Sequence, residues 1–134
     1  MSQENVEVVR SFMASPNDGD WDTMFVWFAL DVELRDLGHA PDAPEVLKGR
    51  EAIRRVVAGW IETYDEFRTE VYEYVDADPW VICDTRWHGT GRGSAVGVEI
   101  RQADAYELKA GKVTRAVLVY PDAVTALAAV ALAD

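Results

Sequence analysis

The chain has 134 residues with a formal net charge of −11 at pH 7, and 49% of its residues are hydrophobic and 28% charged. This length suits one domain that buries its core without disulfides or metals, so we expect a single domain over residues 1–134. One cysteine excludes an internal disulfide, and one cysteine with two histidines does not support a structural zinc site. The acidic balance, without a Lys/Arg cluster, argues against nucleic acid and anionic membranes as partners.

The N-terminal half predicts helices that lead into one strand. A first helix beginning at Ser2 carries an apolar stripe of Val6, Val9, Phe12 and Met13, and residues 15–20 break it. Asp20 is a suitable N-cap for a second helix over 21–30. Alternation predicts a strand over 31–38, and residues 39–49 form a loop punctuated by proline.

The C-terminal half changes from helical to two-residue periodicity. Residues 50–64 show apolar side chains at helical spacing, and residues 67–76, 80–89, 95–108 and 112–120 alternate as strands. Pro121 suits the first turn of a terminal helix. Helices followed by an antiparallel meander predict an α+β fold, with a curved antiparallel sheet wrapped around helices to form a cone with a central pocket.

No run of about 18 apolar residues exists, so we expect no membrane span. The first ten residues lack the positive start and apolar block of a signal peptide. These two observations predict a cytoplasmic protein.

Two aspartates on predicted strands are the candidate chemical groups. Asp104 shares a strand face with Ile100 and Tyr106, and a carboxylate on an apolar face must be hydrogen-bonded, paired or neutralised. Such carboxylates often serve in acid–base chemistry. Two structural alternatives stay open: Asp36 caps loop amides at the strand end, or Asp104 pairs with Arg35 or Arg115.

The inferred inward faces predict an aromatic, mostly apolar box around the two carboxyls. Such walls raise the pKa of one carboxyl and so separate an acid from a base, a pair that suits proton transfer beside a carbonyl. This chemistry requires no metal or cofactor. The predicted substrate-binding side chains on these faces are Phe12, Met24, Phe28, Trp60, Tyr64, Thr85, Trp87, Gln102 and Tyr106.

The outward face of the predicted sheet is unusually apolar. Its members are Ile82, Ala103, Ala105, Val117 and Val119, with Arg86, Glu99 and Arg101 as charged neighbours. An apolar sheet surface facing solvent predicts a partner.

Three segments together resemble the nuclear transport factor 2-like superfamily, and within it the SnoaL-like and ketosteroid-isomerase-like proteins. They are residues 17–38 (NDGDWDTMFVWFALDVELRDLG), 47–60 (LKGREAIRRVVAGW) and 103–120 (ADAYELKAGKVTRAVLVY). The resemblance implies a homodimer packed sheet to sheet. It also implies that Asp36 is a general base, that Asp104 is a protonated partner, and that Tyr120 lines the pocket.

One position departs from the isomerases. Phe12 stands where they place an oxyanion-hole tyrosine, and loss of such a donor costs about 2.7–4 kcal/mol of transition-state stabilisation. We therefore do not expect a steroid isomerase. We expect a protein that binds a small molecule. If it is an enzyme, we expect a cofactor-free isomerase, cyclase or dehydratase that acts on an apolar carbonyl compound. The alternative is a non-catalytic ligand-binding or protein-interaction module of the same fold.

Overall fold

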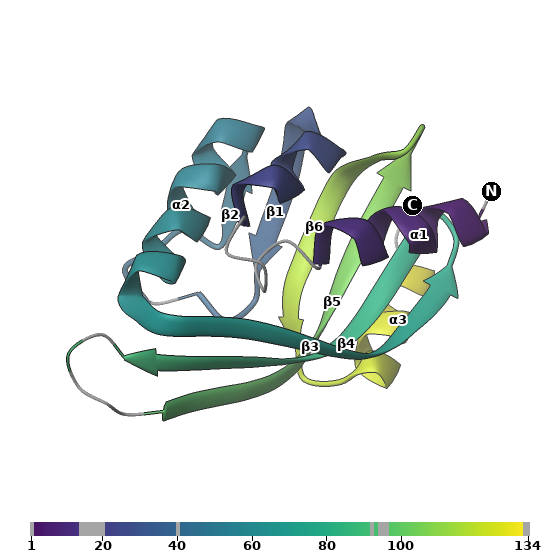
Figure 1. The fold of residues 1–134 in the computed structure, drawn as a ribbon. Helices are drawn as coiled ribbons and strands as arrows, with labels where there is room; N and C mark the ends of the chain where they lie inside the picture. The colour runs from purple at the N-terminus through teal and green to yellow at the C-terminus, as the bar shows by residue number, and fades with distance from the viewer. Residues whose placement is uncertain (1, 14–20, 40, 92, 94–96, 133–134) are drawn as a thin grey trace.

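The computed structural model describes residues 2–13, 21–39, 41–91, 93 and 97–132. The chain forms six strands and the helices that flank them (Figure 1). The elements are α1 (Ser2–Met13), the 3-10 helix η2 (Trp21–Trp27), β1 (Phe28–Asp36), β2 (Val46–Lys48), α2 (Arg50–Thr63), β3 (Tyr64–Ala77), β4 (Trp80–Gly91), β5 (Gly97–Lys109), β6 (Lys112–Tyr120) and α3 (Ala123–Ala131).

The strands form one curved, open sheet in the order β2-β1-β6-β5-β4-β3. Strands β3 to β6 make an antiparallel meander, and β1 joins it parallel to β6. Helices α1 and α2 lie over the concave face, and α3 lies on the other side (Figure 1). The predicted α+β class and curved sheet are confirmed, with one parallel strand pair that the sequence pattern did not indicate.

Three local predictions need correction. Residues 21–27 form a 3-10 helix, and Phe28 already pairs with Val113 in the sheet, so the predicted second helix ends three residues early. Strand β2 lies inside the predicted loop and pairs with Glu33–Arg35; three residues are too few to show a period. The N-cap of α3 is Asp122, whose side chain accepts a hydrogen bond from the Thr125 amide. Pro121 therefore lies just before the helix and not in its first turn. The predicted break at 15–20, with the Asp20 cap, lies outside the described residues.

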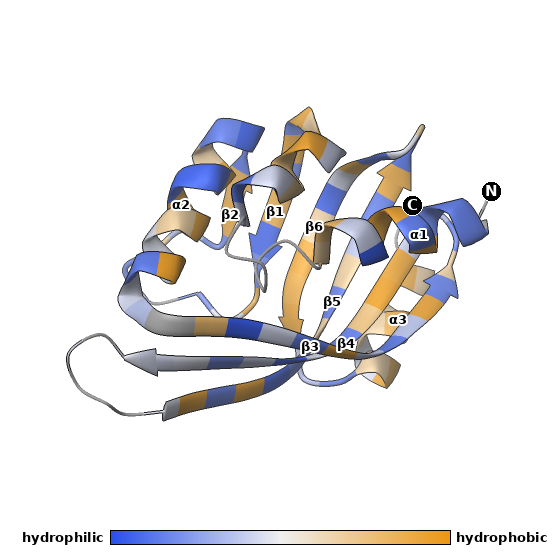
Figure 2. Ribbon diagram, in the orientation of Figure 1, coloured by the Kyte–Doolittle hydropathy of each residue, from blue (hydrophilic) through white to orange (hydrophobic). Residues whose placement is uncertain are grey.

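The main core fills the space between the helices and the concave face. The stripe of α1 buries Val9, Phe12 and Met13 against the sheet. The Phe12 ring meets the Phe28 and Tyr106 rings edge-on, with centroids 5.4 and 5.1 Å apart. Figure 2 shows polar residues on the outer turns of α2 and apolar ones along β4 and β6.

The convex face corrects the expectation of an open apolar surface. Ile82, Ala103 and Ala105 are fully buried there, because Ala126 and Val130 of α3 pack over them. The face that predicted a partner is thus covered by the chain's own terminal helix. None of the described helices is long and apolar enough to cross a membrane.

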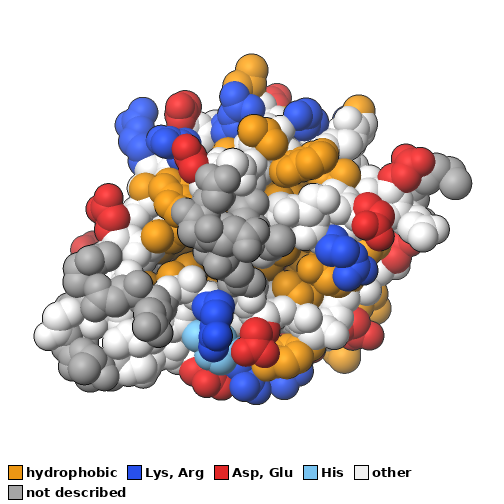
Figure 3. Space-filling view, viewed as in Figure 1, with side chains coloured by type: hydrophobic (Ala, Val, Ile, Leu, Met, Phe, Trp, Pro, Cys, Tyr) orange, Lys and Arg blue, Asp and Glu red, His pale blue; other side chains and the backbone are white. Residues whose placement is uncertain are grey.

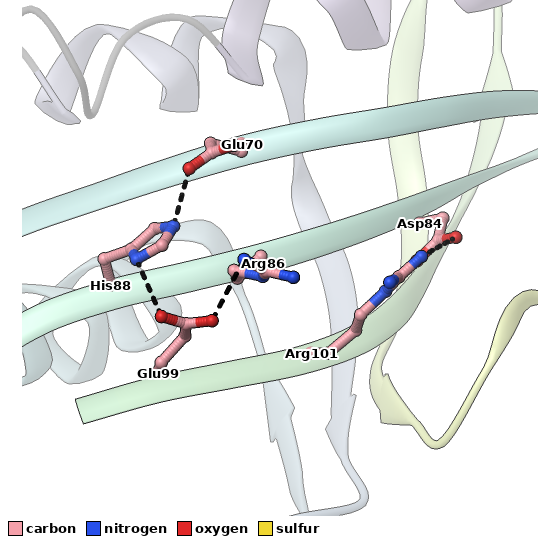
Figure 4. A network of polar contacts seen from close by, with 6 residues as sticks. All are labelled: Glu70, Asp84, Arg86, His88, Glu99 and Arg101. Atoms are coloured by element: carbon pink, nitrogen blue, oxygen red, sulfur yellow. Dashed lines mark hydrogen bonds and ion pairs between the residues drawn. The ribbon is translucent and has the colours of Figure 1, made fainter.

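A polar network follows the part of β3, β4 and β5 shown in Figure 4. The His88 ring lies between two carboxylates, 2.7 Å from Glu70 and 3.6 Å from Glu99. Arg86 pairs with Glu99 at 3.0 Å, and a separate pair joins Arg101 to Asp84 at 3.1 Å. His88 therefore lies among charged partners on the sheet.

Candidate functional site

A cavity of about 420 Å³ lies between the concave face of the sheet and helices η2 and α2. Its volume is within the range of small-molecule pockets, and its wall is mostly apolar. The predicted residues that line it are Asp36, Met24, Phe28, Trp60, Tyr64, Trp87, Gln102 and Tyr106.

Four predicted site residues do not line the cavity. Phe12 lies in the core behind it, and Thr85 is fully buried with its hydroxyl 3.4 Å from the Gln102 carbonyl oxygen. Tyr120 packs on the convex face against the cluster under α3, so the expectation that it faces the cavity is wrong. Asp104 is fully buried behind the wall.

Asp36, the last residue of β1, brings a carboxylate to the cavity wall. Its Oδ1 accepts the Gly38 amide at 2.9 Å, as the loop-capping alternative predicted. A carboxylate has about four lone-pair sites, so this single bond leaves acceptor capacity for a ligand. The neighbouring Arg35 is exposed and pairs with Glu45.

Asp104 lies in the middle of β5 and is held by neutral donors. Its Oδ1 accepts the Gln102 side-chain amide at 2.8 Å and the Val119 backbone amide at 3.0 Å. Arg35 and Arg115 pair with Glu45 and Glu107 instead, so the ion-pair alternative is not what the structure shows. Within the described part of the chain, Asp104 Oδ2 is buried without a hydrogen-bond partner.

The pKa of Asp104 is raised to about 6, chiefly by burial and to a smaller extent by the nearby Asp36 charge. The Val119 and Gln102 amides oppose this rise because they favour the ionised form. The Trp87 indole N–H also lowers the pKa of Asp104, although its geometry falls short of a hydrogen bond and leaves Nε1 without a partner among the described residues. A carboxyl that titrates near neutral pH can both give and take a proton there.

A β-bulge aims the Val119 amide at Asp104. Ala103 pairs with Tyr120 while Ala105 pairs with Val117, so two residues of β6 oppose the single Asp104. Val119 has φ 72°, a conformation that is a genuine outlier for a β-branched residue. Backbone strain of this kind tends to occur at functional sites, where the surrounding structure holds it in place.

The bulge also reverses the predicted direction of Val119. Its side chain was expected on the outward face, but it lines the cavity beside Gly38. A Cβ atom at Gly38 would lie 3.0 Å from Val119 Cγ1, so only glycine fits this close approach without a shift. The extra residue of the bulge thus changes which side chains β6 presents to the cavity.

Gln102, Trp87 and Val119 stand between Asp104 and the cavity. All three line the wall, and each lowers the pKa of the buried carboxyl. A ligand in the cavity is therefore separated from Asp104 by these three residues. Direct contact between the ligand and the Asp104 carboxyl requires one of their side chains to move. Among the described residues, no group of three or more His, Cys, Asp or Glu side chains could hold a metal ion.

Sequence reasoning missed part of the aromatic wall. The Phe67 ring on β3 lies 5.7 Å from Tyr64 and 5.0 Å from Trp87, between centroids, and it lines the cavity. Alternation along β3 carries the signal that could have identified it, because Phe67 shares a face with Thr69 and Val71.

Solved structures of other proteins share the fold. Bal32a, from a soil-derived mobile gene cassette, has a TM-score of 0.78 at 24% identity, over 92% of this chain and 94% of that one. TerC, co-crystallised with polyporic acid, has a TM-score of 0.76 at 15% identity, covering 87% and 91%. SalBIII, an epoxide hydrolase/cyclase-like enzyme in pyran ring formation in the polyether salinomycin, has a TM-score of 0.74 at 20% identity, covering 89% and 93%.

The sequence comparison is more specific. No curated protein matches the chain. The family described as the SnoaL-like domain matches residues 9–116, which span most of the chain and include β1, β5 and both aspartates. The chain therefore belongs to the SnoaL-like domain family.

Proposed function

We propose that this SnoaL-like domain binds an apolar carbonyl compound in the cavity and moves a proton beside the carbonyl group. The observation that carries the proposal is Asp104, a fully buried carboxyl with a pKa of about 6 directly behind an apolar wall that Asp36 lines. Isomerisation, aldol-type cyclisation and dehydration all need such a step. TerC was co-crystallised with polyporic acid and SalBIII takes part in pyran ring formation; both facts concern those proteins and support the class of chemistry proposed for this chain.

The two carboxyls have different proposed roles because only Asp36 lines the cavity. Asp36 touches the cavity and takes the proton from the carbon next to the carbonyl. Negative charge then develops on the carbonyl oxygen, where the N–H groups of Gln102 and Trp87 supply donors on the wall. Asp104, hydrogen-bonded to Gln102, supplies or stores a proton close to neutral pH.

A second candidate function is ligand binding without catalysis. Two observations favour it: Asp104 does not line the cavity, and the buried Phe12 ring has no hydroxyl to donate to a developing charge. In that case the same pocket holds a ligand and the buried carboxyl only orients the Gln102 amide.

Three sequence predictions remain predictions here: the single-domain organisation, the cytoplasmic location and the homodimer. The homodimer has lost one argument, because α3 covers the apolar part of the convex face. What supports it now is the resemblance and the exposed ring of Tyr72, which contacts Arg86 and Arg101 of the polar network in Figure 4.

The first experiment is a carbon NMR titration of the aspartate carboxyls, with Asp104→Asn and Asp36→Asn to assign the signals. We expect Asp104 to titrate near pH 6, well above the usual value of about 3.9. A value at or below 3.9 would remove the physical basis of the catalytic proposal. This measurement needs no knowledge of the substrate.

The second step follows deuterium incorporation from D₂O into a panel of planar ketones by mass spectrometry. We expect exchange with the wild type, none with Asp104→Asn, and unchanged exchange with Asp31→Asn, an exposed aspartate on the same strand as Asp36. If the wild type binds ketones without exchange, and Asp104→Asn binds them equally well, the non-catalytic candidate is correct.

A further inference from the structure

The cavity wall carries one kind of formal charge. Among the described residues that line it, Asp36 is the only Asp, Glu, Lys, Arg or His. Behind the same wall, Asp104 adds a second negative charge whenever it is ionised. An anionic ligand group would therefore face one or two carboxylates in a space where water screens them poorly.

The basic side chains near the cavity have partners outside it. Arg35, next to Asp36, pairs with Glu45, and Arg54 on α2 binds Asp22 with its Nε 2.6 Å from the carboxylate. Arg50 at the start of α2 lies 3.4 Å from the Phe28 carbonyl oxygen. On the face shown in Figure 3, basic side chains are interspersed with acidic ones.

The rest of the wall favours a flat, apolar body. The rings of Tyr64, Phe67 and Trp87 contact one another in sequence, and Trp60 lines the same cavity. Aromatic walls of this kind bind planar ligands by stacking and edge contacts. A ligand ammonium group would be attracted to these carboxylates but would lose most of its hydration in an otherwise apolar space, and this desolvation outweighs the attraction.

We propose that Asp36 is a charge filter: the cavity takes uncharged planar ligands and rejects the same ring systems when they carry a carboxylate or phosphate. This proposal rests on the proposed function only in taking the cavity as the ligand site. It gives Asp36 a role in ligand selection that is separate from proton transfer. Whether or not Asp36 acts as a base, its charge sets which compounds enter.

The test uses three probes with one ring system: 2-acetylnaphthalene, 2-naphthoate and 2-naphthylmethylammonium at neutral pH. Binding is followed by NMR shifts of the Gly38 and Val119 amides and the Trp87 indole N–H, all on the cavity wall. We expect the ketone to bind at least tenfold more tightly than either ion. Equal or tighter binding of naphthoate or of the ammonium probe overturns the proposal, and so does a lack of binding by all three.

Variants then assign the selectivity to one side chain. We expect Asp36→Asn to raise the affinity for naphthoate at least tenfold relative to the affinity for the ketone. Asp31→Asn makes the same change in net charge at an exposed position of β1 and should leave both affinities unchanged. If Asp36→Asn does not fold, Asp36→Ser is used, because its hydroxyl can also accept the Gly38 amide.

The charge filter and the proposed function fail separately. Deuterium exchange in ketones together with equal binding of naphthoate would leave the catalytic proposal standing and reject the filter. Selective binding of the ketone without any exchange would keep the filter and reject catalysis. If Asp36→Asn and Asp31→Asn change naphthoate affinity by the same factor, overall charge and not Asp36 sets the selectivity.

Discussion

The two faces of β5 have different surroundings, a cavity on one side and helix α3 on the other. Toward the cavity the strand presents Gln102, Asp104 and Tyr106, and toward α3 it presents Ala103 and Ala105. All five residues are buried, although they alternate between the side that faces the cavity and the closely packed side under α3. The comparison shows that burial alone does not distinguish a site from a core.

The packed face supports the site face. Small alanines on β5 let the alanine-rich helix α3 approach the sheet closely, with Ala126 fully buried at the contact. This packing fixes the strand from behind, while the bulge in β6 fixes the Asp104 carboxyl from the side. A buried acid keeps a defined geometry only when its surroundings cannot relax around it.

The largest effect is expected from breaking the packed face. Ala105→Arg places a charge without a partner under α3, at a position that has no exposed surface. We expect a loss of about 3 kcal/mol or more in the free energy of unfolding, because a buried, uncompensated charge is strongly destabilising. Urea unfolding followed by circular dichroism measures the change.

The matched control is Ala128→Arg, which makes the same substitution on the exposed side of α3. It should change the free energy of unfolding by less than about 0.5 kcal/mol, the usual range for surface substitutions. Similar stability of both variants would show that α3 is not held against the sheet in solution.

A smaller effect is expected on the site face, where stability should depend on pH through Asp104. An unfolded aspartate titrates at about 3.9, and Asp104 in the folded chain at about 6. Between these pH values the folded state keeps a proton that the unfolded state has released, so stability falls as pH rises from about 4 to about 6 and then stays lower. The shift corresponds to about 3 kcal/mol.

Asp104→Asn removes this dependence, so we expect the variant to match the wild type near pH 4 and to exceed it at pH 8, by up to about 3 kcal/mol. Urea titrations at both pH values give the difference. The lowered pKa values of Asp22, Glu107 and Asp122 produce an opposite trend in both proteins and cancel in the comparison. Parallel curves for the two proteins would contradict the assignment.

The same contrast explains what the sequence could predict. Strand alternation placed Asp104, Gln102 and Tyr106 on one face, and helical spacing found α2, because these patterns record which face is buried. The short strand β2 and the parallel pairing of β1 with β6 depend on contacts between distant segments. No local period reports such contacts.

The errors for Val119 and Tyr120 have one physical source in β6. The bulge adds a residue, so the alternation that correctly places Val117 on the convex face changes phase before Val119 and Tyr120. The convex face was misjudged for a different reason: alternation shows that Ala103 and Ala105 are apolar but not whether a helix or a partner covers them. Sequence pattern thus identified the buried carboxyl and most of the wall in front of it, but not the place of Val119 in that wall.

The smallest effect concerns the strain in that bulge. Val119→Ala removes a partly buried side chain but keeps the positive φ, whereas Val119→Gly removes more atoms and relieves the strain. At an ordinary strand position glycine is the less stable of the two; here we expect Val119→Gly to be the more stable by about 1 kcal/mol. Urea unfolding at pH 4, where Asp104 is protonated, separates this effect from the charge. The reverse order would mean that the bulge holds Val119 without strain and that the Asp104 bond arises from the sheet alone.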